Sequence, residues 1–218
     1  MLTFVTSDLH LGSRHFLGEL FSAFLNSLPA GAQLVLNGDI VDYVHTRIPP
    51  AHERVIHLLS EESRRRKVIW IHGNHDPEFR PVDSGEIEFH KSYALGRRLF
   101  ITHGYAFDNI IPYNRLFIKV FRALHRFRVL LGAEPVHVAE YAKKWSLFYS
   151  VLRKSVMMNA IEYAKENGFE SVTCGHTHFM EERVVDGIRY MNTGSWTERP
   201  VGYVLVDDAE VKLCEFHC

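Results

Sequence analysis

Clusters of Asp, Asn and His occur at five places along the chain, each directly after an apolar stretch. They are Asp8-Leu9-His10, Gly38-Asp39-Ile40-Val41-Asp42, Gly73-Asn74-His75-Asp76, His103-Gly104 and Gly175-His176-Thr177-His178. Any single cluster could be a polar turn, because Asn and Asp favour turns. Five clusters that all end apolar stretches favour a shared site instead.

These side chains suit divalent metal ions. Imidazole and carboxylate ligands together favour manganese, iron or zinc, and the clusters contain no thiolate. The candidates also outnumber the ligands that one ion needs. A pair of ions roughly 3.5–4 Å apart, bridged by a carboxylate, can clamp a phosphoryl group and activate a water molecule. The clusters therefore predict a two-ion site for phosphoryl chemistry, and the adjacent glycines would let the backbone turn sharply beside the ions.

The elements that must position these clusters alternate between strand and helix in the first third of the chain. Apolar runs predict strands at 2–8, 32–39 and 67–76, and helical spacing predicts helices at 15–28 and 51–66. Segments 86–95 and 97–104 suggest a hairpin-type pair, and short strands are expected at 170–178, 183–194, 201–207 and 210–216. This order predicts a layered α/β (α+β) fold. Ligands bind outside the carboxyl ends of strands in open α/β sheets, where the clusters would lie.

The bulk composition indicates a globular protein of the cytosol. The chain has 218 residues, of which 46% are hydrophobic and 23% charged, with a net charge of -1. Its cysteines are Cys174, Cys214 and Cys218, an odd number without metal or redox spacing, which indicates a reducing compartment. We expect no signal peptide and no membrane-spanning helix. A net charge this small does not indicate a nucleic-acid partner.

The order D-x-H, G-D-x-x-D, G-N-H-D, H-G and G-H-x-H resembles the calcineurin-like metallophosphoesterase superfamily, from Thr3 to about Trp196. The resemblance implies a β-sandwich flanked by helices. It also implies hydrolysis of phosphoester or pyrophosphate bonds by metal-bound hydroxide, without a covalent enzyme intermediate.

The resemblance implies a role for each residue of the motifs. Asp8, His10 and His178 would hold the first ion, and Asn74, His103 and His176 would hold the second. Asp39 would bridge the two ions. His75 would act at the phosphate and the leaving-group oxygen, and Asp42 would accept a hydrogen bond from His75 and fix its orientation. We expect manganese, with iron and zinc as alternatives.

A basic, apolar segment interrupts the pattern, and we interpret it as a helical cap at 112–167 within a single domain, 1–218. Nine Lys and Arg residues and two Glu residues lie between Asn114 and Lys154, so this segment carries +7 and the remainder -8. One interpretation is a surface that faces a membrane or a lipid; the other is a packed cap with solvated cations. Candidate substrate-binding residues are Arg115, Lys119, Arg122, Lys143 and Lys144.

The segment and two motifs resemble one branch of the superfamily, the UDP-2,3-diacylglucosamine diphosphatases of lipid A synthesis. H-G-Y-A-F-D at 103–108 is similar to its H-G-D-x-F-D, and residues 187–198 are similar to the segment after its last histidines. Tyr105 departs from the usual aspartate, and His75 from the arginine of that branch. A lipid-linked nucleotide sugar and peripheral membrane association are thus implied. The alternatives are a soluble phosphodiesterase of cyclic nucleotides or nucleic acid, and a non-catalytic scaffold, although every expected ligand is present. No obligate protein partner is inferred.

Overall fold

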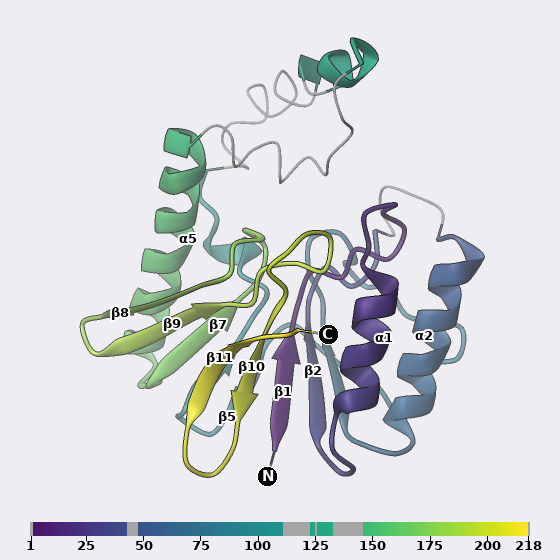
Figure 1. Ribbon diagram of the computed structural model, residues 1–218. Coiled ribbons are helices and arrows are strands. Elements are labelled where there is room, and N and C mark those ends of the chain that lie inside the picture. Colours follow the sequence, from purple (N-terminus) through teal and green to yellow (C-terminus); the bar gives the residue numbers. More distant parts are fainter. Residues whose placement is uncertain (1, 43–47, 111–122, 125, 133–145, 218) are drawn as a thin grey trace.

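The structure is a computed structural model that describes residues 2–42, 48–110, 123–124, 126–132 and 146–217. Two mixed β-sheets form its centre (Figure 1). The six-stranded sheet has the order β11 (Val211–Glu215), β10 (Gly202–Val206), β1 (Thr3–Thr6), β2 (Gln33–Asn37), β3 (Val68–Ile71) and β4 (Glu88–His90). The five-stranded sheet has the order β5 (Tyr93–Leu95), β6 (Leu99–Ile101), β7 (Ser171–Cys174), β9 (Ile188–Asn192) and β8 (Glu181–Val185).

The two sheets pack against each other through one face of each. Val5 and Ile69 of the six-stranded sheet share a buried cluster with Ile101 and Met191 of the five-stranded sheet. Successive residues of a strand point to opposite faces, so the neighbours of these residues face the helices instead. This arrangement explains why β1, β2, β3 and β7 are buried along their whole length, and why their sequences contain no charged residue.

Helices cover the outer face of each sheet. Helices α1 (Gly18–Ser27) and α2 (Pro50–Ser63) flank the six-stranded sheet, and α5 (Ser146–Glu166) flanks the five-stranded sheet (Figure 1). The apolar residues of α1 recur at helical spacing and are buried. Pro50 begins α2, a position at which a backbone N–H would have no hydrogen-bond partner within the helix. The predicted layered fold, a sandwich flanked by helices, is therefore confirmed.

The expected hairpin-type pair at 86–95 and 97–104 is confirmed for β5 and β6, but the extent of its first strand is wrong. Residues 86–95 form two strands, not one: β4 pairs in parallel with β3, and β5 pairs antiparallel with β6 in the other sheet. The chain therefore crosses between the sheets at 91–92. The segment expected as a strand at 183–194 also contains a turn at Asp186-Gly187, which joins the antiparallel pair β8 and β9.

Part of the predicted cap at 112–167 lies outside the described residues, namely 112–122, 125 and 133–145. Within the described part, α5 forms its second half, and the short 3-10 helix η1 (Tyr105–Phe107) precedes it. The limits of the cap and its reach over the site stay predictions. In the part of the chain that the structure describes, no helix is long and apolar enough to cross a membrane.

The topology brings the five polar clusters to one edge. Strands β1, β2 and β3 run parallel, and so do β6 and β7, so their carboxyl ends share an edge within each sheet. Asn37 joins the two edges, because its side-chain amide donates to Thr102 O at 2.9 Å and its own carbonyl oxygen lies 2.9 Å from His103 Nδ1.

Candidate metal centre

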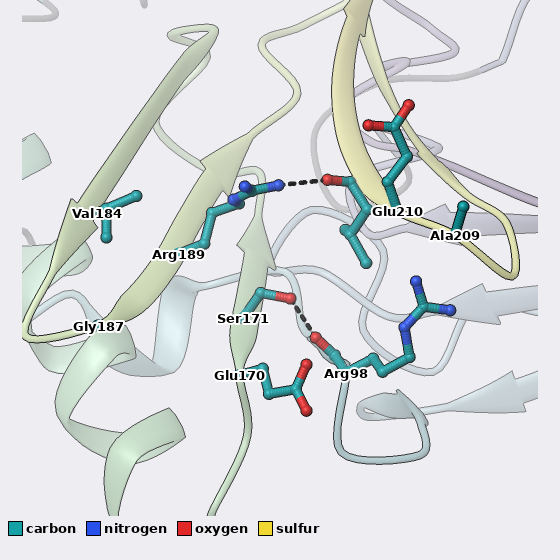
Figure 2. Close-up of a pocket in the computed structure, with 9 residues that line it drawn as sticks. Arg98, Glu170, Ser171, Val184, Gly187, Arg189, Ala209 and Glu210 are labelled. Carbon is teal, nitrogen blue, oxygen red and sulfur yellow. Dashed lines mark hydrogen bonds between the residues drawn. The ribbon is translucent and has the colours of Figure 1, made fainter.

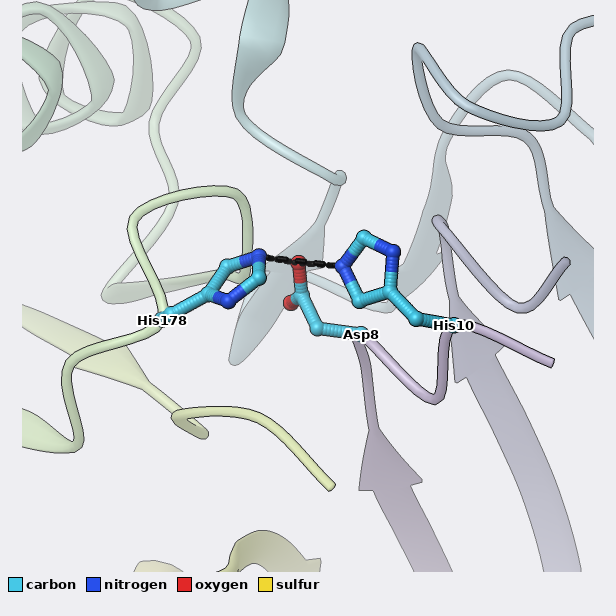
Figure 3. A group of neighbouring side chains, drawn as sticks. All are labelled: Asp8, His10 and His178. Atoms are coloured by element: carbon cyan, nitrogen blue, oxygen red, sulfur yellow. Dashed lines mark hydrogen bonds and ion pairs between the residues drawn. The ribbon is translucent and has the colours of Figure 1, made fainter. Parts of the chain in front are cut away.

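The predicted first-ion residues form one buried group. Nε2 of His178 lies 3.2 Å from Oδ1 of Asp8 and 3.0 Å from Nε2 of His10. Figure 3 shows the two imidazole rings on opposite sides of the Asp8 carboxylate. Potential ligand atoms of these three residues all lie within 4.8 Å of one another. Two ring nitrogens and a carboxylate oxygen that converge in this way suit a divalent ion.

The backbone at these residues adopts a left-handed conformation. Asp8, His10, Asp39, His176 and His178 have φ values between 51° and 65°. Residues other than glycine seldom adopt positive φ, although Asn, Asp and His do so more readily than others. The chain leaves each strand through a tight loop, and this loop turns the side chain back toward the shared edge.

Asp42 fixes the ring of His10. Nδ1 of His10 lies 2.7 Å from Oδ1 of Asp42, and a carboxylate oxygen accepts rather than donates. His10 therefore carries a hydrogen on Nδ1, and its Nε2 faces Asp8 and His178. Burial acts to raise the pKa of Asp8, but His178 and His103 hold it well below its usual range, so Asp8 is ionised.

Asp39 and His103 form the centre of the second group. Nε2 of His103 is fully buried and lies 3.1 Å from Oδ2 of Asp39 without hydrogen-bond geometry, while its Nδ1 donates to the Asn37 carbonyl oxygen. Burial alone would lower the pKa of His103, but Asp39 and Asp8 raise it to about 9. Nε2 of His103 and Oδ2 of Asp39 are both electron-rich, so a cation must lie between them at this distance. In the metal-free protein that cation is a proton on His103. A divalent ion fits the same position.

Asn74 and His176 lie on the open side of the second group. Oδ1 of Asn74 lies 3.0 Å from Nδ1 of His176, and Nε2 of His176 lies 2.9 Å from Oδ2 of Asp108. In a neutral His176 ring whose hydrogen faces Asp108, an amide oxygen and a ring lone pair face each other. Both are metal-binding atoms, and a cation between them would satisfy both.

His75 lies beside these groups but is more exposed. Its side chain is 21% exposed, compared with 0% for His10 and His103. Its backbone N–H donates to Asp39 Oδ1 at 2.7 Å, and its Nδ1 lies 2.8 Å from Asp42 Oδ1. Burial acts to raise the pKa of Asp42, but His10 and His75 hold it far below its usual range. The ionised Asp42 thus orients both rings.

The comparison with known families identifies the fold and its chemistry. Residues 1–180 match the family model described as calcineurin-like phosphoesterase. The chain belongs to this family. It is therefore a hydrolase of phosphoester bonds, and the donor set that the structure assembles is the kind of site that a metal-dependent phosphoesterase requires.

Solved structures resemble this phosphoesterase at low identity. YfcE, a phosphoesterase from E. coli, is 16% identical with a TM-score of 0.48, and all of each chain is covered. Vps29 from Entamoeba histolytica, solved with zinc, is 17% identical with a TM-score of 0.49 and the same coverage. A predicted phosphoesterase from Streptococcus pneumoniae TIGR4 is 18% identical with a TM-score of 0.45, covering 98% of this chain and 87% of its own. No curated protein matches the chain.

Two acidic residues support the phosphoesterase site without having been assigned a role from the sequence. Asp76 accepts hydrogen bonds from Gly73 N at 2.6 Å and Ile40 N at 2.9 Å, so it ties the loop after β3 to the loop after β2. Asp108 contacts His176 as described above. The only sequence signals for them are the last letters of G-N-H-D and H-G-Y-A-F-D.

The motif glycines Gly73 and Gly175 have a different role from the one expected. Neither has a positive φ, so neither is needed for a left-handed turn. A Cβ atom on Gly73 would lie 2.2 Å from Asp39 Oδ1, and one on Gly175 would lie 2.1 Å from Asp8 Oδ2. These glycines leave the space that the two carboxylates occupy.

The candidate substrate residues Arg115, Lys119, Arg122, Lys143 and Lys144 all lie outside the described residues, so their role stays a prediction. Arg153, another cation of the basic segment, is engaged within the fold. Its Nε donates to Glu181 Oε1 at 3.0 Å, and its guanidinium lies 3.4 Å from the centre of the Phe179 ring. It therefore anchors α5 to the loop after the paired histidines.

A separate cavity of about 410 Å³ lies near the amino ends of β6, β7 and β9 (Figure 2). Its lining includes Arg98, Glu170, Arg189 and Glu210. Nη1 of Arg189 donates to Val211 O across this region (Figure 2). None of the predicted site residues lines it. The polar clusters, at the carboxyl ends of β6 and β7, are thus distinct from this cavity.

Proposed function

We propose that this phosphoesterase uses two divalent ions, and that Asp39 bridges them. The observation that carries this proposal is the position of Asp39 in two overlapping groups, one with His10 and His75 and one with Asp8 and His103. A carboxylate has two oxygens and can serve two ions. We further propose manganese as the ion, because carboxylate, amide and imidazole ligands all suit it.

The bound ions would polarise the phosphoryl group and lower the pKa of a water molecule. The protein's own contribution at the phosphate comes from His75 and Asp42. Asp42 accepts from His75 Nδ1 and so fixes the orientation of the ring. His75 Nε2 can then donate to the leaving-group oxygen as charge develops there.

As substrate we propose a lipid-linked nucleotide sugar such as UDP-2,3-diacylglucosamine, cleaved at its pyrophosphate. The support is the similarity at 103–108 and 187–198 together with exposed apolar side chains on the described part of the basic segment. Leu130 is 83% exposed and Leu131 is 73% exposed, and Arg126 and Arg128 lie nearby in sequence. Such a surface suits acyl chains and anionic head groups, so the proposal includes peripheral association with the cytoplasmic face of a membrane.

A second candidate substrate is a soluble phosphodiester, such as a cyclic nucleotide or nucleic acid. The observation that favours it is the pair of departures at Tyr105 and His75. Tyr105 is 44% exposed and its ring centre lies 6.1 Å from that of His103, so a large side chain stands at the rim where the lipid branch has aspartate.

The decisive experiment is a substrate panel assayed with added Mn²⁺. The panel contains the lipid-linked UDP-sugar, a cyclic nucleotide, bis-p-nitrophenyl phosphate and a phosphomonoester. We expect the highest kcat/KM for the lipid-linked substrate, and a higher value for the cyclic nucleotide would overturn the lipid assignment. The Asp39→Ala variant is assayed in parallel, with bound metal measured by plasma emission. Full activity in that variant would overturn the bridging role.

A further inference from the structure

Asp108 is a buried carboxylate that holds a predicted metal ligand without being one. Its side chain is 2% exposed and lies directly after η1. Oδ2 lies 2.9 Å from Nε2 of His176, and Oδ1 accepts the backbone N–H of Ile110 at 2.8 Å. The two oxygens therefore have separate tasks: one orients a ring from the other end of the chain, and one closes a local turn.

The contact with Asp108 determines which nitrogen of His176 is available. A carboxylate oxygen accepts a hydrogen bond, so a neutral His176 ring, the form that can bind a metal ion, carries its hydrogen on Nε2. The lone pair then lies on Nδ1, which faces Asn74 Oδ1 at 3.0 Å. With the opposite tautomer, Nδ1 would carry a hydrogen and could not bind an ion.

Two other predicted metal-binding histidines, His10 and His103, show the same arrangement with the nitrogens exchanged. Nδ1 of His10 donates to Asp42, and Nδ1 of His103 donates to the Asn37 carbonyl, which directs each Nε2 toward the centre. Histidines that bind metals usually donate their other nitrogen to a carboxylate or carbonyl, which fixes the tautomer and the ring orientation. Asp108 completes this pattern for His176.

Helix α5 holds Asp108 in place. The side-chain amide of Asn159 donates to Phe107 O at 2.8 Å, and the Phe107 ring packs 5.6 Å from the ring of Tyr163. The same helix holds the histidine loop, because Tyr149 Oη donates to Thr177 O at 2.5 Å. Carboxylate and imidazole are thus both anchored to one rigid element.

We propose that Asp108 is a positioning residue for the second ion: it keeps the hydrogen of His176 on Nε2 and so presents Nδ1 to the metal. The inference rests on the two-ion site of the proposed function. It concerns metal binding and is independent of the substrate.

The Asp108→Ser variant separates the two tasks of the carboxylate. A serine hydroxyl can still accept from the backbone two residues on, but it is too short to reach His176. Calorimetric titration with Mn²⁺ should show the affinity for the second ion reduced by about 10- to 100-fold, with the first ion unchanged. Asn74→Ala, which removes a predicted ligand of the second ion, should show the same loss. His178→Ala, which removes a predicted ligand of the first ion, should weaken the first ion instead. Wild-type affinity at both sites would overturn the proposal.

Asp207→Ser is the matched control. Oδ1 of Asp207 also accepts a backbone N–H two residues on, that of Ala209 at 2.7 Å, but this carboxylate contacts no predicted metal ligand. The control should bind both ions as the wild type does. Loss of the second ion in this control as well would make the effect of Asp108→Ser nonspecific and overturn the positioning role.

A measurement on the unmodified protein covers the case in which Asp108→Ser does not fold. Long-range ¹H–¹⁵N NMR of the ring nitrogens, assigned with His176→Gln, should find the hydrogen of His176 on Nε2. A hydrogen on Nδ1 alone would overturn the proposal. If the wild type binds one ion only, the two-ion function fails, and the tautomer still decides the role of Asp108.

Discussion

Nδ1 of His75 lies 2.8 Å from Oδ1 of Asp42, so the most exposed of the predicted site histidines is held by an ionised carboxylate. The same oxygen also orients His10, at 2.7 Å. One carboxylate therefore connects the residue that would act on the leaving group with a residue that would bind the first ion.

Replacement of His75 by Ala should lower turnover and leave bound metal nearly unchanged. The ring would donate to the leaving group, and a positioned acid of this kind contributes roughly 10²- to 10⁴-fold to a rate. Turnover with bis-p-nitrophenyl phosphate and metal content by plasma emission check this. Loss of both ions would show that His75 is a ligand instead.

Asp42→Asn should impair both turnover and binding of the first ion. The amide keeps the shape of Asp42 but loses the charge that His10 and His75 share. We expect metal affinity to fall by about 10- to 100-fold, which distinguishes this variant from His75→Ala. Calorimetric titration with Mn²⁺ gives the affinity, and an affinity equal to that of the wild type would contradict the shared role.

Gly175→Ala should displace the Asp8 carboxylate and weaken the first ion. The added Cβ would lie 2.1 Å from Asp8 Oδ2, closer than any real contact, so one of the two must move. The control is Gly31→Ala, which meets no atom within 4 Å but has a φ of +76°. Calorimetry should show weaker metal binding for Gly175→Ala alone. Thermal denaturation should show a lower Tm for Gly31→Ala, and an equal loss of metal in both would refute the steric account.

Metal binding should strengthen, and the metal-free protein should lose stability, as the pH rises from 6.5 to 9. The pKa of His103 is raised from 6.5 to about 9 in the folded protein, despite burial, by Asp39 and Asp8. The stability that this proton contributes is full below pH 6.5 and disappears as the pH rises through 9. The proton also competes with the ion for Nε2.

Melting temperatures with and without Mn²⁺, measured under argon at several pH values, check this pH dependence. The difference between the two curves should widen with pH. A constant difference would mean that no ligand releases a proton when the ion binds.

The sequence was sufficient for most of the strands and for the clusters at their ends, because strands buried on both faces appear as short, largely apolar stretches without charges. It was insufficient where a feature depends on contacts between distant segments. Asp108 acts on His176, 68 residues away, and Gly175 is required by the side chain of Asp8. The passage of the chain between the sheets at 91–92 has no glycine or proline to mark it. The roles of the residues at the site, and the extent of the cap, stay predictions.

The left-handed backbone at five predicted metal ligands lowers the stability of the fold while it places side chains that the reaction needs. These residues are Asp8, His10, Asp39, His176 and His178. Each such residue costs of the order of 1–3 kcal/mol unless its surroundings compensate. A glycine at any of these positions would adopt the same backbone more readily and would remove a metal-binding side chain. An inactive protein of this fold could thus be as stable as the active one, so the capacity to fold alone would not preserve these residues. Only a requirement for the reaction itself would keep them in place.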